Sequence, residues 1–377
     1  MPQYNVKETK HRESSHQKRV KELEEELAAT KYNKKTQHHI GLVKAKLARV
    51  KGEYQRKSSA RGKTEGFAVK RTGDATTIIV GFPSVGKSTL LNAITNANSR
   101  VGAYAFTTLT CIPGLLEYNH AKIQVLDVPG IVEGAATGRG RGKEVLACAL
   151  SADLVIILLD VFHPKHLDIV KKEICETGLR INQKPPIVRI TKKARGGIDV
   201  SSTIKLINLN EEAIKAILKE FRLDSCSIVI REDITDDQLI DAIEDNRIYV
   251  PAITVLNKID MVDAHELERV KAIVNPDICI SAEKKINAEE LKELIYKRLE
   301  FIQVFCKEVG KKADMGVPLI MRKGDTLRDV CLKLHKDFVA KFKFARILGK
   351  SVKFGSLVIR NLGHQLEDGD IIELHIK

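Results

Sequence analysis

The sequence predicts an α/β protein built on a doubly wound, mostly parallel sheet. Short runs rich in Val, Ile and Leu each end at a polar motif, and segments with helical periodicity separate these runs. Ligands of such sheets bind at the carboxyl ends of the strands, which is where the polar motifs fall. The runs and motifs are TTIIV before GFPSVGKST, KIQVLD before VPG, LVIILLD before VFHP, AITVL before NKID, and ICI before SAE.

The composition is that of a water-soluble globular protein with several modules. The chain has 377 residues, of which 43% are hydrophobic and 30% are charged, and this length exceeds that of one ordinary domain. Its longest apolar run, LVIILL at 154–159, is far shorter than the roughly 18 residues that span a bilayer. No hydrophobic segment follows the basic start, and the seven cysteines include no C-x-x-C pair. We therefore expect a cytoplasmic protein without a membrane partner.

The positive charge is concentrated at the two ends of the chain. Residues 1–60 hold 15 Lys and Arg against 7 Asp and Glu, and residues 301–377 hold 15 against 9. The rest of the chain holds 33 residues of each sign. A neutral body with two basic ends predicts that the ends contact RNA or the ribosome, and improved solubility is the alternative role of these lysines.

Sequence patterns divide the chain into five segments. Residues 1–60 predict an antiparallel helical hairpin, because apolar residues recur at helical intervals on both sides of the basic break KYNKKTQHH. Residues 179–246 predict an inserted α+β subdomain with strands at IVRIT, TIKLI and SIVI. Residues 61–178 and 247–300 are the two expected parts of the main domain, and residues 301–377 predict a small β-grasp module.

The segment GFPSVGKST predicts a phosphate-binding loop. It satisfies G-x-x-x-x-G-K-[ST] between a strand and a helix, where backbone amides and the helix N-terminus cradle phosphate oxygens. Lys87 is expected to reach the β- and γ-phosphates, and Ser88 to ligate Mg²⁺. The expected nucleotide contacts in this loop are Gly81, Phe82, Pro83, Ser84, Val85, Gly86, Lys87, Ser88 and Thr89.

Three further loops complete the pattern of a guanine-nucleotide site. In DVPG, Asp127 is suited to hold Mg²⁺ through a water, and the amide of Gly130 to sense a γ-phosphate. In NKID, the carboxylate of Asp260 can accept both N1–H and N2–H of guanine, whereas adenine offers no such donor pair. The predicted nucleotide is therefore GTP or GDP. The expected contacts in these loops are Asp127, Val128, Pro129, Gly130, Ile131, Asn257, Lys258, Ile259, Asp260, Ser281, Ala282 and Glu283.

A fifth segment, AYAFTTLTCIPG, is expected to order over Mg²⁺ and the γ-phosphate in the GTP state. It holds two candidate Mg²⁺-sensing threonines, Thr107 and Thr108. Ile131 stands directly after DVPG, where Ras-like GTPases carry the glutamine that orients the attacking water. A hydrophobic side chain cannot orient water, so we expect a low intrinsic rate of hydrolysis. Water would then be placed by backbone and metal once a partner orders the glycine-rich segment that follows.

Taken together, GFPSVGKST, YAFTTLTCIPG, LDVPGIVEGAATGRGRG and NKID resemble the developmentally regulated GTP-binding proteins, the DRG branch of the Obg-related TRAFAC GTPases. The resemblance covers nearly the whole chain. It implies a ribosomal-S5-like insertion and a C-terminal TGS domain. The family pattern F-x-T aligns with Phe106, Thr107 and Thr108, which implies Thr108 as a metal ligand beside Ser88 and Asp127. Lys87, Thr108 and Gly130 are then the expected catalytic groups.

The resemblance also implies a function and partners. It implies a cytoplasmic GTPase that works with translating ribosomes and, in eukaryotes, is stabilised by a DFRP-type partner protein; no DNA partner is expected. K⁺ stays open as a further cofactor, although Ser84 stands where some relatives carry the asparagine that helps to hold K⁺. Two alternatives also stay open: an RNA- or ribosome-binding scaffold for which GTP is mainly structural, and an Obg-like ribosome-assembly GTPase.

Overall fold

In the computed structural model the chain divides into two units, residues 1–66 with 183–249, and residues 67–182 with 250–377. The structure describes residues 6–31, 36–60, 73–95, 112–127, 151–353 and 355–376, and only the backbone of residues 6–17 and 54–60. Within these ranges, no helix combines the length and the apolarity needed to cross a membrane.

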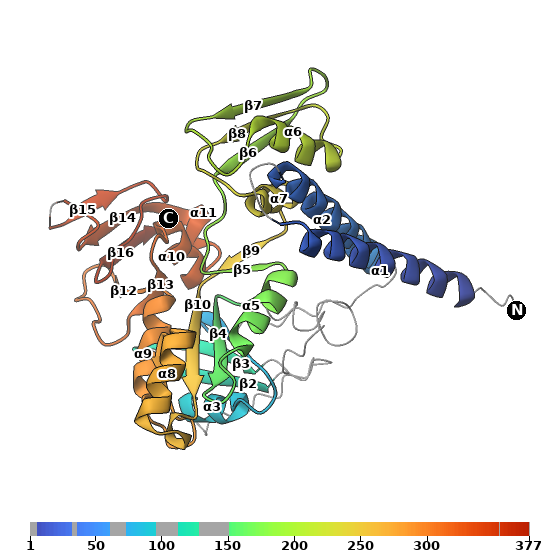
Figure 1. The fold of residues 1–377 in the computed structure, drawn as a ribbon. Helices are drawn as coiled ribbons and strands as arrows, with labels where there is room; N and C mark the ends of the chain where they lie inside the picture. Colours follow the sequence, from blue (N-terminus) through green and yellow to red (C-terminus); the bar gives the residue numbers. More distant parts are fainter. Residues whose placement is uncertain are drawn as a thin grey trace, which may run out of the picture. The chain divides into compact units, whose positions relative to one another are not determined.

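A six-stranded sheet forms the centre of the second unit, in the order β11-β10-β4-β1-β3-β2. Strands β10, β4, β3 and β2 of this sheet are labelled in Figure 1. All neighbouring strands are parallel except β2, which runs antiparallel to β3. The strand LVIILLD is buried along its whole length, as a central parallel strand requires. These strands are β1 (Ala75–Val80), β2 (Ile112–Tyr118), β3 (Ala121–Asp127), β4 (Leu154–Asp160), β10 (Ala252–Asn257) and β11 (Ile278–Cys279). The predicted mostly parallel α/β sheet is confirmed.

Strand β2 is absent from the sequence prediction because its sequence, IPGLLEY, contains proline and glycine. Both residues weaken a strand interior, but proline is tolerated at a sheet edge, where its missing N–H faces no partner strand. β2 is such an edge strand.

Helices pack on this sheet and surround one apolar core. Side chains of α3 and α9, such as Leu90 and Leu291, are fully buried in the cluster formed with Ile79, Ile123 and Leu158 of the strands. Helix α5 packs against β4. The helices of this domain are α3 (Lys87–Ile94), α5 (His166–Glu176), the 3₁₀ turn η2 (Ile259–Met261), α8 (Ala264–Val274) and α9 (Ala288–Arg298).

The first unit joins the N-terminal hairpin to the inserted segment. Helices α1 (Val6–Ala29) and α2 (Gln37–Ala60) run antiparallel, and Lys51 Nζ lies 2.9 Å from Glu24 Oε1. Lys44 of α2 forms ion pairs with the first turn of α7. The inserted sheet has the order β6-β8-β7. The inserted elements are β6 (Val188–Lys192), β7 (Ile198–Ser202), α6 (Glu211–Glu220), β8 (Cys226–Ile230) and α7 (Asp236–Glu244). Strands β5 (Leu179–Ile181), of the second unit, and β9 (Ile248–Val250) precede and follow the inserted segment in the chain.

The predicted strand at TIKLI, residues 203–207, is wrong. This stretch forms bends, and the amide of Ile207 donates to Asp233 Oδ1 at 2.9 Å instead of to a neighbouring strand. The Ile207 side chain is 81% exposed. The strand lies just before this stretch, because Ile198 and Val200 alternate into the core of the subdomain.

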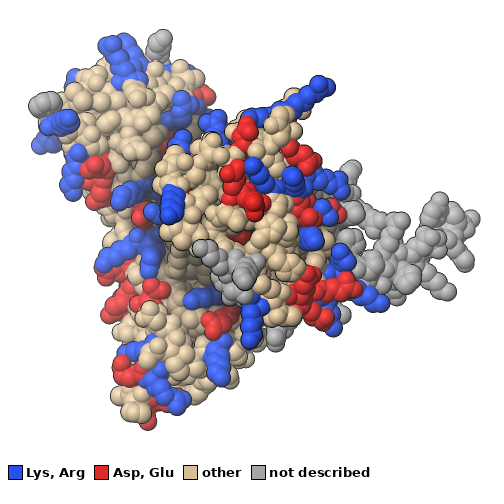
Figure 2. Space-filling view, turned by 45° about the horizontal axis from the view of Figure 1, so that its top comes forward, with Lys and Arg blue, Asp and Glu red and all other residues tan. Residues whose placement is uncertain are grey.

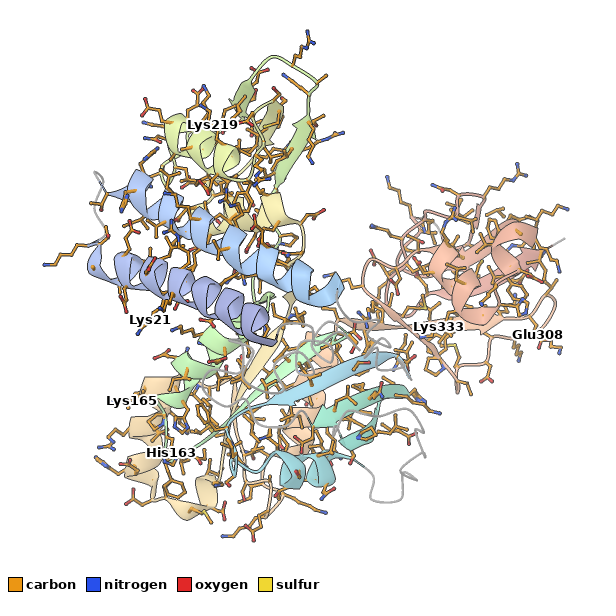
Figure 3. All side chains as sticks on the ribbon, turned by 90° about the vertical axis from the view of Figure 1, so that its right-hand side faces the viewer. Lys21, His163, Lys165, Lys219, Glu308 and Lys333 are labelled. Atoms are coloured by element: carbon orange, nitrogen blue, oxygen red, sulfur yellow. The ribbon has the colours of Figure 1, made fainter. Side chains whose placement is uncertain are left out.

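The C-terminal module is a five-stranded sheet in the order β13-β12-β16-β14-β15, with helix α10 packed on it. Two ion pairs join this sheet module to the amino ends of β1 and β4. Arg322 Nη2 lies 2.9 Å from Asp153 Oδ2, and Lys333 Nζ, labelled in Figure 3, lies 2.7 Å from Asp74 Oδ1. The elements are β12 (Phe301–Lys307), β13 (Leu319–Arg322), α10 (Leu327–Leu334), α11 (Phe338–Lys341), β14 (Phe342–Leu348), β15 (Leu357–Ile359) and β16 (Ile371–Ile376).

Candidate functional site

The phosphate-binding loop connects β1 to α3, and its backbone needs glycine at one position. Gly86 caps α3 with φ 97°, a left-handed conformation that disfavours other residues. A Cβ atom at Gly86 would also lie 2.5 Å from Asn257 Nδ2. Glycine is therefore required both by the turn and by the close approach of the NKID loop.

The side chain of Lys87 folds back onto this loop. Its Nζ donates to the carbonyl oxygens of Gly81 at 3.2 Å and Phe82 at 2.9 Å. Burial lowers the pKa of Lys87, and the nearby negative charge of Asp127 opposes that shift. Bound phosphates would supply a full negative charge to this partly desolvated ammonium group.

The two described metal candidates lie in direct contact. Ser88 Oγ donates to Asp127 Oδ2 at 2.6 Å. The other carboxylate oxygen, Asp127 Oδ1, is buried and has no hydrogen-bond partner among the described residues. A buried carboxylate oxygen without a partner is costly unless a cation or water satisfies it. This donor set therefore fits a hard cation such as Mg²⁺.

The carboxamide of Asn257 joins three loops of the candidate site. This side chain is buried, with 2% of its surface exposed. Its Nδ2 donates to Val85 O at 2.9 Å, and its Oδ1 accepts from Ala282 N at 3.0 Å. The phosphate-binding loop, the NKID loop and the Ser281–Ala282 loop are thus held together by one side chain.

Two further residues of the NKID loop are positioned by specific contacts. Lys258 has φ 65°, and its Nζ donates to Ser84 O at 2.8 Å. A hydrogen bond from Ser281 lowers the pKa of Asp260, and Lys284 Nζ lies 3.4 Å from this carboxylate. Asp260 is therefore ionised over the physiological pH range, as acceptance of two N–H groups from guanine requires.

Comparisons with known proteins agree with this geometry. A model described as 50S ribosome-binding GTPase matches residues 76–193, a model for the C-terminal region of the same domain matches 195–301, and a TGS domain model matches 302–376. An uncharacterized GTP-binding protein of Methanocaldococcus jannaschii is 51% identical over 95% of this chain and 92% of its own. Developmentally-regulated GTP-binding protein 1 of Xenopus laevis is 41% identical to this chain, and developmentally-regulated GTP-binding protein 2 of Homo sapiens is 39% identical. Each match covers 94% of this chain and 98% of the relative.

The chain belongs to the family of developmentally regulated GTP-binding proteins. The resemblance inferred from the motifs is confirmed, as are the GTP-binding character of the family and the C-terminal TGS domain. GTP and GDP are the nucleotides of this family of P-loop GTPases, in which Mg²⁺ is the usual metal.

The structure brings together three of the five predicted loops and Asp127, the first residue of a fourth. The P-loop, Asp127, the NKID loop and the Ser281–Glu283 loop all lie at the carboxyl ends of neighbouring strands. The remaining predicted residues lie outside the described part of the chain, and their roles stay predictions: Phe106, Thr107, Thr108, Val128, Pro129, Gly130 and Ile131.

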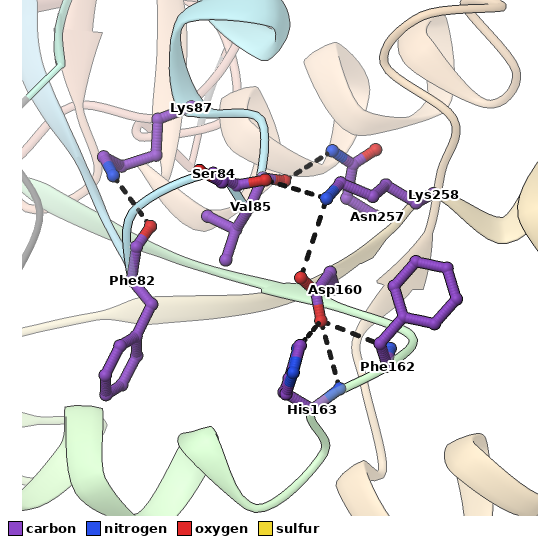
Figure 4. A network of polar contacts seen from close by, with 9 residues as sticks. All are labelled: Phe82, Ser84, Val85, Lys87, Asp160, Phe162, His163, Asn257 and Lys258. Carbon is purple, nitrogen blue, oxygen red and sulfur yellow. Dashed lines mark hydrogen bonds and ion pairs between the residues drawn. The ribbon is translucent and has the colours of Figure 1, made fainter.

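Sequence reasoning missed two charged residues of the site, Lys284 and Asp160. Lys284 pairs with Asp260, the predicted base-recognition residue. Asp160 ends β4 beside Lys258 (Figure 4). A carboxylate that ends the apolar run LVIILLD is the signal that could have identified Asp160. Lys284 gives no such signal, because it is one of many surface lysines.

If Asp260 selects the base, as the sequence predicts, a single substitution should change nucleotide preference. In the Asp260→Asn variant the amide would donate to the C2 carbonyl of xanthine and lose one acceptor for guanine. We expect GDP affinity to fall about a hundredfold and xanthosine diphosphate to bind more tightly than GDP. Equilibrium titration with labelled nucleotides measures both affinities. Glu268→Gln, an exposed carboxylate-to-amide change on α8, is the matched control. An unchanged preference for GDP would contradict the assignment of Asp260.

Proposed function

We propose that this chain hydrolyses GTP slowly and works as a ribosome-associated switch in translation. The observation that carries the proposal is the joining of three nucleotide loops by Asn257, beside the contact between Ser88 and Asp127. A site already arranged for base, phosphate and metal supports discrimination between GTP and GDP, which a switch requires.

The chemistry proposed for the site is positioning and neutralisation of phosphate charge. Lys87 would leave the P-loop carbonyls and contact the β- and γ-phosphates. Ser88 and Asp127, together with Thr108, would hold Mg²⁺, which when bound neutralises charge on these phosphates. The amide of Gly130 would report the presence of the γ-phosphate. Because Ile131 offers no polar group, we expect hydrolysis to be slow until a partner orders the segment that follows.

A basic segment of the TGS domain supports contact with RNA of the ribosome. Residues 338–366 contain no Asp or Glu. Figure 2 shows mostly Lys and Arg over this module, at the upper left of the view. The model description "50S ribosome-binding GTPase" also supports a ribosomal partner, and such a partner would place the protein in the cytoplasm. The cations of this segment are Lys341, Lys343, Arg346, Lys350, Lys353 and Arg360.

Removal of the P-loop lysine tests the catalytic proposal. We expect Lys87→Ala to lower the rate of Mg²⁺-dependent GTP hydrolysis about a hundredfold or more, because one charged donor to the phosphates is lost. Phosphate release by the purified protein, with and without ribosomes, is the measurement. The wild-type rate should rise when ribosomes are added. An unchanged rate in Lys87→Ala would contradict the catalytic role of this site.

Substitutions in the basic segment test the ribosomal partner. Lys343→Gln with Arg360→Gln removes two exposed cations. We expect weaker co-sedimentation with ribosomes and a salt-dependence slope smaller by about 1 per lost phosphate contact. Arg269→Gln with Lys297→Gln, exposed on α8 and α9, is the control of equal charge change.

An equal loss of binding in the test pair and in this control would contradict the assignment of the surface. The same co-sedimentation assay distinguishes a nucleotide-dependent switch from the alternative role, a ribosome-binding scaffold. Identical binding with GDP, GTP and a non-hydrolysable analogue would favour a scaffold over a switch.

A further inference from the structure

The loop after β4 contacts the nucleotide site through a buried carboxylate. Asp160 ends β4 directly opposite Asn257 of β10, and its side chain is 8% exposed. Asp160 Oδ2 lies 3.6 Å from Lys258 Nζ, which donates to Ser84 O of the P-loop (Figure 4). The ammonium group of Lys258 therefore has a carboxylate on one side and a P-loop carbonyl on the other.

The other oxygen of Asp160 fixes the loop that follows. Asp160 Oδ1 accepts from the amides of Phe162 at 3.2 Å and His163 at 3.0 Å, and it lies 2.9 Å from His163 Nδ1. The ring of His163, labelled in Figure 3, stacks on His166 with 4.8 Å between ring centroids. The His166 ring stacks in turn on Phe82 at 4.0 Å.

These contacts form a closed ring that begins and ends on the P-loop. One side runs from Ser84 through Lys258 to Asp160, and the other returns through the two imidazoles to Phe82. The carboxylate is the one anionic group among these contacts. Burial of a carboxylate at the end of an apolar strand costs free energy unless partners satisfy it, and Asp160 has partners for both oxygens.

We propose that Asp160 is a positioning residue of the guanine-nucleotide site, acting through Lys258. Its carboxylate restrains the lysine side chain against the P-loop. Nucleotide binding then does not have to order this long, flexible side chain. The nucleotide affinity is therefore not lowered by the loss of side-chain conformational entropy. This inference rests on the proposed assignment of the nucleotide site, and it adds a residue from outside the motifs of that site.

A double-mutant cycle tests whether Asp160 acts through Lys258. Asp160→Asn keeps an acceptor for the two loop amides and removes the negative charge. We expect labelled GDP to dissociate about fivefold faster from this variant, as loss of one partly exposed ion pair implies. In a Lys258→Met background, the same substitution should change the dissociation rate less than about twofold, since its partner is already absent.

Asp168→Asn, an exposed carboxylate in the first turn of α5, is the matched control and should leave the rate unchanged. The melting temperature of each nucleotide-free variant is measured in parallel, because a purely structural role would lower it equally in both backgrounds. If Asp160→Asn does not fold, Asp160→Ser takes its place with the same expected outcome.

An equal acceleration in both backgrounds, or no acceleration in either, would overturn the role of Asp160 while leaving the nucleotide site intact. Failure of the wild-type chain to bind labelled GDP at all would instead overturn the proposed site, and this inference with it.

Discussion

The proposed nucleotide site depends on the two hydrogen bonds made by the carboxamide of Asn257. Its two polar atoms hold Val85 of the P-loop and Ala282 of the loop after β11, although these residues lie far apart in the chain. The contact is possible only because Gly86 carries no Cβ atom where the amide approaches. A hydrogen-bonded amide in a buried position stabilises one arrangement of the loops, since each broken bond would leave a desolvated polar group. The loops proposed for base recognition and for phosphate binding are therefore linked by one side chain.

Polar side chains gather at the carboxyl ends of the strands, where each needs a hydrogen-bond or ionic partner because the neighbouring core is apolar. Asp127 ends β3, Asp160 ends β4, and Asn257 ends β10. Asp160 finds its partners in protein groups, whereas one oxygen of Asp127 has none among the described residues. That difference separates a residue that positions other side chains from one that is available to a cation. The strands supply rigid ends, and the side chain at each end decides which chemistry occurs there.

Much of this site could be predicted from sequence because each motif follows a strand at fixed spacing. GFPSVGKS and NKID specify backbone turns as well as side chains, so their chemistry can be inferred without coordinates. The sequence marks Asp160 as a carboxylate at the end of a strand, but its contact with Lys258 could not be inferred, nor could the contact of Lys284 with Asp260, because only the tertiary structure brings these partners near. Likewise, β2 contains proline and glycine that normally oppose a strand, and its edge position resolves the conflict. The bends at 203–207 depend on Asp233, a hydrogen-bond acceptor more than 20 residues further along the chain. The domain boundaries and the residues of the fifth loop stay predictions.

Competition between nucleotides for the site joined by Asn257 is the most direct test of the proposed base specificity. We propose that the P-loop, the NKID loop and the Ser281–Ala282 loop form one site, in which the ionised carboxylate of Asp260 selects guanine. Fluorescent GDP would be bound to the wild-type protein with Mg²⁺ and then challenged with unlabelled GTP or ATP at equal concentration. We expect GTP to displace the label and ATP to leave it bound. Equal displacement by ATP would contradict the proposed base specificity.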